Sequence, residues 1–302
     1  MSSTAVVLLL IAAFTHAGWN FLGKRDHPTL AYFLVANTMG VVCVLPILIY
    51  YCSKISFIPP TVWVFSIISG FFLASYMTAL AGAYRVGDMS IAYPLARSLP
   101  VIIVTMIIIF LGKGHEIGEW LIVGIALVVA GCLMLPMKKF HDFRLQNYLD
   151  LCCLLAVLAA IGISGYTVVD DEALRRLRQL PGKPFDPVNA TLVYLVLEGI
   201  CASFWKGVFV LVSSRERKNL VEVWHSAKGS AAMTGIGIYL TYGLVLASMN
   251  YVTNVSYVAA FRQLSIPLGA VLGMVLLKEP HYLPKLIGLA IVFLGLILVG
   301  IG

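Results

Sequence analysis

The chain alternates long apolar runs with short polar breaks along its whole length. A bilayer core about 30 Å thick takes roughly 20 apolar residues per helix. With this length the pattern predicts ten membrane-spanning helices, at residues 3–22, 30–51, 62–84, 90–112, 117–136, 147–169, 188–213, 229–249, 254–277 and 283–301. Since the runs are unbroken instead of alternating at every second residue, they favour helices over a β-barrel.

The composition supports a membrane protein. Of the 302 residues, 60% are hydrophobic and 12% are charged, whereas soluble chains are about 45–50% apolar and about 25% charged. These values exclude a water-soluble enzyme, a nucleic-acid-binding module and a disordered tail. The net charge of +7 comes from Lys and Arg scattered over the polar breaks, without a basic stripe. We expect this charge to set membrane topology and to contact anionic lipid, and we expect no nucleic acid partner.

Motifs of other chemistry do not occur in the sequence. The six cysteines show neither CxxC spacing nor a nearby group of histidines, which predicts small packing residues instead of a metal site or a disulfide framework. There is no GxSxG, HExxH or P-loop motif. We therefore expect a non-enzyme without catalytic residues, metal or cofactor. The apolar run at residues 5–14 is not preceded by Lys or Arg, and it predicts a first membrane helix instead of a cleaved signal peptide.

The two halves of the chain share a pattern. Residues 80–135 and 244–299 each carry a Ser-x-Pro triplet inside a helix and, further on, two glycines seven positions apart. The matching positions are Pro100, Gly124 and Gly131 in the first half and Pro267, Gly288 and Gly295 in the second. Five helices plus five give one repeat at 1–140 and another at 145–302. A repeat with an odd number of spans re-enters the membrane from the opposite side, so we expect inverted copies, as in secondary transporters.

Several motifs stand in a characteristic order. They are His16-Ala-Gly-Trp19-Asn20 in the first helix, the segment from Pro94 to Pro100, and the glycine-spaced helices that close the halves. In this order they resemble the EamA-type ten-helix members of the drug/metabolite transporter superfamily. The resemblance implies a carrier of small metabolites, often an exporter, with a central cavity between the halves and peripheral fifth and tenth helices. The stretch from Asp170 to Pro187 departs from it, and we expect a short surface helix at 172–179 there.

Ionisable residues inside the predicted spans are the candidates for a transport site: Arg97, Glu198, Lys206, Arg262 and His16. A Lys or Arg at mid-membrane costs about 2.5–3.5 kcal/mol on insertion scales, so its retention indicates a cavity or a partner. Arg97 and Arg262 lie three and five residues before the paired prolines, each of which frees a carbonyl one turn back, and this favours a hydrated pocket. The candidate substrate-binding set also includes Tyr93, Ser265, Gln263, Trp19 and Asn20, with Pro100 and Pro267 as helix kinks.

Each of these residues has a structural alternative. Both arginines lie near enough to a helix end to snorkel to the interface. Glu198 is either one member of a buried ion pair or a group that binds substrate or a coupling proton. Lys206 lies about 12 Å further along the same helix and cannot pair with Glu198 directly. His16 is either a proton relay or a histidine hydrogen-bonded to its neighbours. The acidic run 170–172 is expected to be a solvated helix end.

The charges favour an anionic substrate, because three cations face one carboxylate in the spans. In the sugar-phosphate translocators of the superfamily, cations on the fourth and ninth helices hold phosphate, and by resemblance Arg97 and Arg262 take that place. Here, however, the neutral Gln263 follows Arg262, so a carboxylate, a phosphonate or a zwitterionic amino acid fits as well. We predict a secondary-active transporter of a small polar, anionic metabolite that works by alternating access and is coupled to protons or to an exchanged substrate. The alternative is an exporter of amino acids or drug-like compounds, or a flippase of lipid-linked substrates.

The orientation in the membrane stays open. If both termini are cytoplasmic, as in better-known relatives, the cytoplasmic loops carry six Lys and Arg and the opposite loops carry twelve. The positive-inside rule favours the reverse. In either case we expect a multi-pass protein of the cell (inner) membrane, as a monomer or a homodimer in the lipid bilayer.

Overall fold

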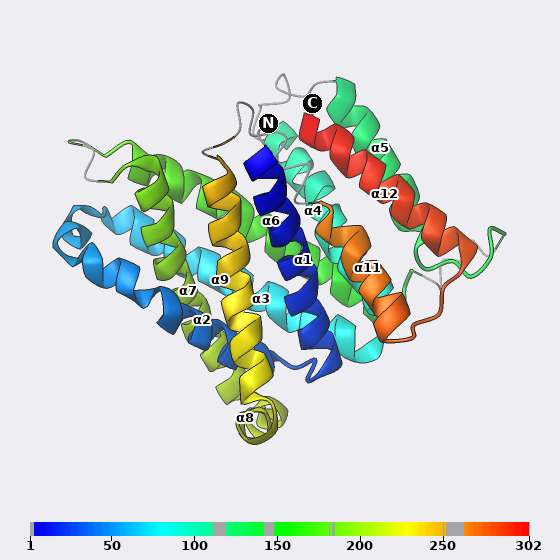
Figure 1. Cartoon of the computed structure of the whole chain (residues 1–302), viewed down its shortest axis with the longest axis horizontal. Helices are drawn as coiled ribbons and strands as arrows, with labels where there is room; N and C mark the ends of the chain where they lie inside the picture. The colour runs from blue at the N-terminus through cyan, green and yellow to red at the C-terminus, as the bar shows by residue number, and fades with distance from the viewer. Residues whose placement is uncertain are drawn as a thin grey trace.

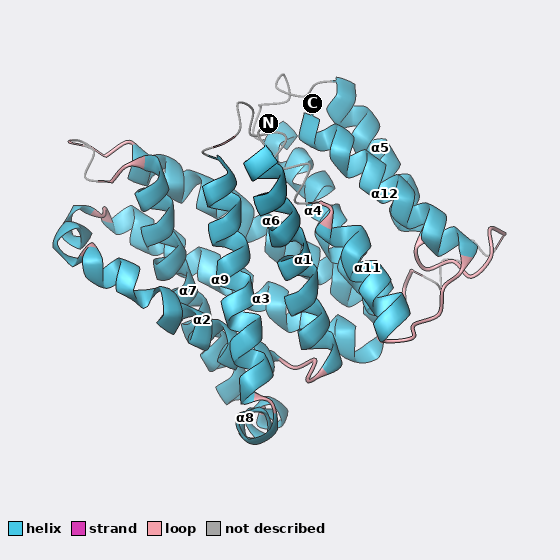
Figure 2. Cartoon of the chain, viewed as in Figure 1, coloured by secondary structure: helices cyan, strands magenta, loops and turns pink. Residues whose placement is uncertain are grey.

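The computed structural model describes residues 3–110, 119–141, 148–180, 182, 185–249, 251 and 263–301, and in these residues every regular element is a helix (Figure 1; Figure 2). The α-helices are α1 (Ser3–Arg25), α2 (Leu30–Tyr50), α3 (Pro60–Val86), α4 (Met89–Phe110), α5 (Glu119–Met134), α6 (Leu151–Arg178), α7 (Pro187–Val212), α8 (Ser214–Ser226), α9 (Lys228–Met249), α11 (Ser265–Leu276) and α12 (Leu283–Ile301). A 3-10 helix runs over Cys52–Phe57. The predicted all-helical class is confirmed for this part of the chain.

Seven of the described helices are long and apolar enough to cross a membrane, namely α1, α2, α3, α4, α6, α7 and α12, and α5 and α11 are shorter apolar helices. This is the pattern of a multi-pass membrane protein. The helix α9 covers the predicted span 229–249. Of the predicted span 254–277, residues 254–262 lie outside the described residues, and α11 covers most of the remainder. Residues 111–118 and 147, which include the ends of three other predicted spans, are also outside the described residues.

The helix α6 is longer than the sequence analysis predicted. The predicted span ended at residue 169 and a separate surface helix was expected at 172–179, but α6 continues without a break to Arg178. Its buried stripe also continues, because Ala173 and Leu177 are fully buried in the same cluster as Tyr194. Packing against α7 therefore carries the helix through the acidic run, and the prediction of a separate surface helix was wrong.

The segment between α7 and α9, predicted as a connection, forms the amphipathic helix α8, which is seen end-on below α9 in Figure 1. The hydroxyl of Ser213 accepts a hydrogen bond from the Glu216 N–H and caps its first turn. Glu216 is itself buried, and its Oε2 accepts a hydrogen bond of 3.0 Å from the backbone N–H of Ala31. Through this bond α8 caps the amino end of α2, which offers N–H groups without partners inside the helix.

The paired glycines of the sequence bring α5 and α12 into backbone contact. A Cβ on Gly131 would lie 2.6 Å from the Gly288 carbonyl oxygen, and a Cβ on Gly124 would lie 2.7 Å from the Gly295 carbonyl oxygen. Small residues allow helices in a membrane to approach this closely. The two helices lie side by side at one edge of the molecule (Figure 1), which agrees with the expected peripheral position of the fifth and tenth helices.

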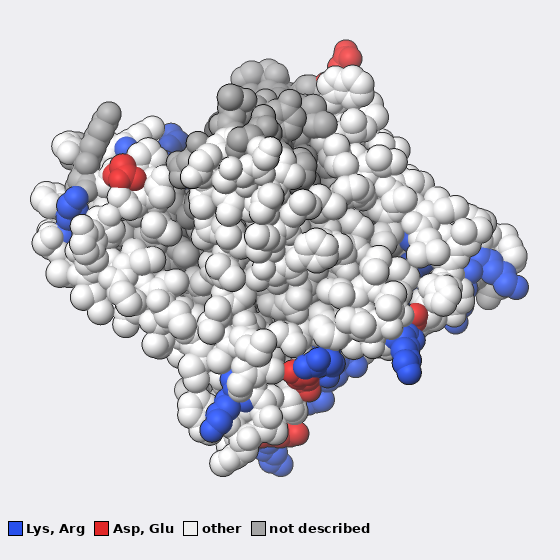
Figure 3. Space-filling model, in the orientation of Figure 1, with Lys and Arg blue, Asp and Glu red and all other residues white. Residues whose placement is uncertain are grey.

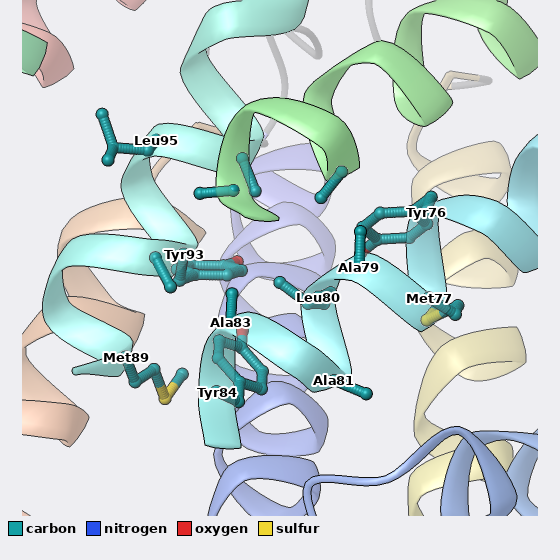
Figure 4. Packing of buried hydrophobic residues seen from close by; sticks show 14 of the residues in the cluster. Tyr76, Met77, Ala79, Leu80, Ala81, Ala83, Tyr84, Met89, Tyr93 and Leu95 are labelled. Atoms are coloured by element: carbon teal, nitrogen blue, oxygen red, sulfur yellow. The ribbon is translucent and has the colours of Figure 1, made fainter. Parts of the chain in front are cut away.

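A cluster of buried aromatic and apolar side chains fills the space between α1, α3 and α4 (Figure 4). Tyr84 and Tyr93 are fully buried in it, and Met89 packs at the start of α4. Lys24, near the end of α1, donates hydrogen bonds to the carbonyl oxygens of Tyr84 and Gly87. The end of α3 is thereby tied to α1.

Charge is distributed unevenly over the molecule. In the view of Figure 3, Lys and Arg side chains gather along the lower edge, around the end of α1 and around α8, and the broad middle of the face is uncharged. Both chain ends lie at the opposite, upper edge in Figure 1. The uncharged band is the surface expected to face lipid, and the basic edge matches the larger Lys and Arg count found in the sequence.

Candidate functional site

A cavity of about 230 Å³ lies at the centre of the helix bundle. Helices from both halves of the chain contribute to its wall, namely α1, α2, α3, α4, α6, α7 and α9. On α6 the lining residues lie in the second half of the helix, and on α9, which runs upward in Figure 1, they extend from Ile238 near the middle to Val245. On α1 the lining residues His16 and Trp19 lie in the second half of the helix, away from the N-terminus, so the cavity is central along the bundle.

Its wall combines aromatic with polar side chains. The residues that line the cavity are His16, Trp19, Asn37, Leu73, Tyr76, Met77, Arg97, Tyr166, Asp170, Leu174, Tyr194, Leu195, Glu198, Gly199, Ile238, Tyr239, Thr241, Tyr242 and Val245. A concave site with many aromatic groups and a few polar ones is typical of a small-molecule site.

Two carboxyl groups meet on one side of this cavity. Asp170 of α6 and Glu198 of α7 lie close enough to interact with each other. The Ser69 hydroxyl of α3 lies 2.5 Å from Asp170 Oδ1 and 3.2 Å from Glu198 Oε1. Tyr194 donates a hydrogen bond of 2.8 Å to Asp170 Oδ1. Three helices therefore hold the pair of carboxyl groups in place.

Two further side chains in the cavity wall carry buried hydrogen-bond donors without acceptors among the described residues. Arg97 on α4 and Trp19 on α1 both line the cavity. The Arg97 Nε and Trp19 Nε1 atoms are buried and have no hydrogen-bond partner among the described residues. Buried donors normally have partners, so these two atoms depart from the usual pairing.

Behind the wall, a hydrogen-bonded network joins α1, α3, α4 and α11. The His16 Nδ1 atom lies 2.9 Å from the Tyr93 hydroxyl, and Ser265 is hydrogen-bonded to the same tyrosine. Asn20 donates to the His16 carbonyl oxygen, and its own Oδ1 accepts a hydrogen bond from Tyr84. This network fixes the helices around the cavity.

The predicted site residues fall into separate groups. Arg97, Glu198, His16 and Trp19 line the cavity, whereas Tyr93, Asn20 and Ser265 belong to the network behind it. Lys206 is fully buried outside the cavity lining, and Gln263 Oε1 is buried without a partner among the described residues. Pro100 lies inside α4 and Pro267 in the first turn of α11. Arg262 lies outside the described residues.

Asp170 is the site residue that the sequence analysis missed. The acidic run was expected to be a solvated helix end, and this holds for Glu172, which pairs with Arg175 and Arg176, but it was wrong for Asp170. A signal was present, because Tyr166, Asp170 and Leu174 recur at every fourth position and share one helix face. The described lining thus holds two carboxyl groups and one guanidinium, and this balance differs from the surplus of cations counted along the sequence.

The other end of the molecule is closed by polar bonds between the halves. The Glu279 carboxylate accepts hydrogen bonds of 2.6 and 2.8 Å from the N–H groups of Met89 and Ser90, at the start of α4. Lys285 is fully buried and donates to Asp88 Oδ2 at 3.2 Å and to Ser90 Oγ at 3.0 Å. These contacts join α12 and the loop before it to the turn between α3 and α4.

Comparison with known proteins finds a family match in the first half of the chain. Residues 3–137 match the EamA-like transporter family. None of the curated proteins matches the chain. A solved structure described as "Crystal structure of protein" superposes with a TM-score of 0.51 at 17% sequence identity, covering 99% of this chain and 96% of that chain. At this identity the likeness shows a shared fold, and it extends over both halves.

Proposed function

We propose that the protein carries a small polar metabolite with an anionic group through the central cavity. Residues 3–137 match the EamA-like transporter family, which implies a multi-pass membrane transporter of the drug/metabolite type. The observation that carries this proposal is the Arg97 guanidinium in the cavity wall, where Arg97 is the one Lys or Arg among the described lining residues. A carboxylate, phosphate or phosphonate group would form charge-assisted hydrogen bonds with this guanidinium.

The proposed architecture is ten spans in two inverted repeats, at 1–140 and 145–302. The order of helix packing supports it. In a two-fold arrangement the contact of α1 with α9 corresponds to that of α6 with α3, and the contact of α4 with α6 corresponds to that of α11 with α1. The pairs α5 with α12 and α2 with α7 lie on the axis and correspond to themselves. Each of these contacts exists among the described helices.

The proposed transport cycle is alternating access between the two ends of the bundle. Access is assigned to the end that carries the chain termini, since polar bonds join the two halves of the chain at the opposite end. The bonds of Glu279 and Lys285 close the opposite end, and they connect one half of the chain to the other. In the second state these bonds would break while the upper ends of the helices close.

Proton coupling is the proposed source of energy, and Glu198 is its candidate residue. Two neighbouring carboxyl groups can share one proton, and Asp170 is such a neighbour of Glu198. His16 supports the proposal less, because its Nδ1 already bonds to Tyr93. The proposal includes no catalytic step and no cofactor, and it places the protein in the cell (inner) membrane as a monomer or homodimer.

Ligand-dependent thermal stabilisation of the purified protein in detergent tests the substrate proposal. A ligand present at 100 times its Kd stabilises the folded state by about 2.7 kcal/mol. Organic phosphates, phosphonates and carboxylates are compared with cationic drugs, for the native protein and for Arg97→Gln. The matched control is Arg85→Gln, at the exposed end of α3. We expect anions to stabilise the native protein and the control but not Arg97→Gln. Equal stabilisation of Arg97→Gln would reject Arg97 as the anion site.

A further inference from the structure

A groove lies on the outside of the bundle, between the first turns of α2 and the amphipathic helix α8. Its volume is about 570 Å³, against about 230 Å³ for the central cavity. Its apolar wall consists of Leu34, Val35 and Met39 of α2 and Leu220, Val221 and Trp224 of α8. The groove is separate from the central cavity, because Val35 and Met39 lie roughly 160° around α2 from the cavity-lining Asn37.

The position of this groove matches the surface of a bilayer. The bond from the Ala31 N–H to the Glu216 carboxylate fixes α8 at the height of the first turn of α2. This is the edge of the molecule where Lys and Arg side chains gather (Figure 1; Figure 3). From Leu34 to Met39 the wall rises along α2 by about 7.5 Å, and an amphipathic helix at a membrane surface buries its apolar face by roughly 5–10 Å. The half-exposed Trp224 is typical of the same level, because tryptophan is enriched at the membrane–water interface.

Basic side chains flank the groove on α8. Arg217 and Lys218 lie one turn before Val221 on the same side of the helix, and Lys228 follows at the start of α9. All three cations are exposed, and Lys218 and Lys228 form no ion pair with the described residues. Glu222 is the exposed carboxylate that α8 sets against them. The groove thus combines an apolar channel with a positively charged border.

A second copy of the chain fits this groove less well than a lipid does. Most homodimers have two-fold interfaces, in which the same surface of each copy meets itself. Contact through the groove would bring the cations of two α8 helices face to face, and like charges across an interface weaken binding. A phospholipid with a negative headgroup has the opposite charge, and its acyl chain is apolar like the wall of the groove.

From this arrangement we propose that the groove between α2 and α8 is a binding site for one anionic phospholipid. An acyl chain lies along the apolar wall, and the phosphate lies toward Lys218 and Lys228. The lipid joins α8 to α2 in addition to the bond of Glu216, and it therefore stabilises the folded protein. The site is independent of the substrate of the central cavity, so it is tested separately from the proposed function.

Native mass spectrometry of the full chain in detergent counts the lipids that the protein binds. The probes are dioleoyl phosphatidylglycerol, dioleoyl phosphatidylcholine and glycerol phosphate, which distinguish an anionic lipid from a neutral lipid and from a free phosphate. Lys218→Gln and Lys228→Gln each remove one cation beside the groove. Arg215→Gln is the matched control, because Arg215 is exposed and lies on the opposite side of α8 from Trp224.

A second variant, Thr38→Trp, blocks the groove itself. Thr38 is an exposed residue of the groove wall, and an indole at this position would occupy the space that an acyl chain needs. Ile49→Trp is its control, since Ile49 is exposed on the same face of α2 about three turns further on and does not line the groove. Thermal unfolding without added lipid establishes that each variant is folded.

We expect the native protein to bind one phosphatidylglycerol, about tenfold more tightly than phosphatidylcholine, and to bind no glycerol phosphate. Each Lys or Arg near an anionic lipid surface contributes about fivefold in affinity, so Lys218→Gln and Lys228→Gln should weaken phosphatidylglycerol by that factor. Thr38→Trp should lose the lipid, and both controls should keep it. Phosphatidylglycerol should also raise the unfolding temperature of the native protein more than phosphatidylcholine does.

Several outcomes overturn the site. Equal binding of the two lipids would show that the headgroup charge is not read, and so would unchanged affinity in both lysine variants. Undiminished lipid binding by Thr38→Trp would place the lipid elsewhere, and binding of glycerol phosphate as tight as that of the lipid would assign the cations to a free phosphate. A dimer without bound lipid that Thr38→Trp converts into monomers would assign the groove to a second copy of the chain.

Discussion

The Ser69 hydroxyl lies 2.5 Å from Asp170 Oδ1 and 3.2 Å from Glu198 Oε1, so that one residue of α3 joins carboxyl groups of α6 and α7. These two helices belong to the second half of the chain, whereas Ser69 belongs to the first. The contact therefore connects the two halves at the wall of the cavity, where a carrier must change its structure during transport.

Replacing Ser69 by alanine should lower stability by about 1–3 kcal/mol, since it leaves buried acceptors without their donor. The comparison is Ser66→Ala on the same helix face. Ser66 is also fully buried, but its hydroxyl bonds to the Val62 carbonyl of its own helix, and we expect a smaller loss. Thermal unfolding in detergent measures both. A larger loss for Ser66→Ala would contradict the role assigned to Ser69.

Gly131→Ala should destabilise the protein, because the new Cβ would lie 2.6 Å from the Gly288 carbonyl oxygen, a backbone atom that cannot turn aside. The helices α5 and α12 would have to separate. Gly207→Ala on α7 is the control, since nothing lies within 4 Å of a Cβ there. An alanine in an open helical position is expected to gain about 0.5–1 kcal/mol. Thermal unfolding should therefore move in opposite directions for the two variants, and a shift in the same direction would count against the close contact.

Glu279→Ala should loosen the closed end of the molecule by removing the acceptor of two N–H groups at the start of α4. Cys152 is a natural reporter, because it is buried next to Gly87 at this end. In a variant that keeps Cys152 as its single cysteine, labelling by a membrane-impermeant maleimide should become about tenfold faster or more, as expected for a lost hydrogen bond to a charged group. Glu216→Ala, which removes the cap of α2 instead, should leave the labelling rate nearly unchanged. An unchanged rate in Glu279→Ala would show that this carboxylate does not close the end.

Tyr93→Phe separates the predicted substrate-binding role of this residue from a structural one. The Tyr93 hydroxyl contacts His16 Nδ1 and Ser265 behind the cavity wall. We expect a stability loss of about 1 kcal/mol and unchanged binding of the anion that Arg97 is proposed to hold. Tyr50→Phe, at an exposed position near the end of α2, should change neither. Loss of anion binding in Tyr93→Phe with unchanged stability would support direct contact with the substrate.

The apolar runs predicted most helices correctly because a membrane span needs a minimum length of apolar sequence, which is visible without a structure. The extension of α6 and the presence of α8 were missed for one reason. Both segments carry charges that end an apolar run, yet Ala173 and Leu177 in α6 and Val223 in α8 are buried against neighbouring helices. Packing continues a helix where hydropathy alone predicts its end.

The paired glycines indicated a repeat in the sequence, whereas in the structure they allow two helices to pack closely. As a pattern they indicated a repeat, and in the structure Gly124 lies against Gly295 and Gly131 against Gly288. Spacing along one helix is set by the chain, but the choice of the partner helix depends on the fold.

The sequence by itself determined that the protein lies in a membrane, that it is helical and roughly where its helices lie. All three follow from the hydropathy of consecutive residues. It also singled out Arg97 and Glu198, because a charge in a span is costly wherever it lies. The tertiary structure decided which charges share a cavity. It brought Asp170 to Glu198, left Lys206 outside the cavity lining and placed Tyr93 in the network behind the wall. Such distances depend on how helices far apart in the sequence pack against each other, and the order of residues along one helix does not contain that information.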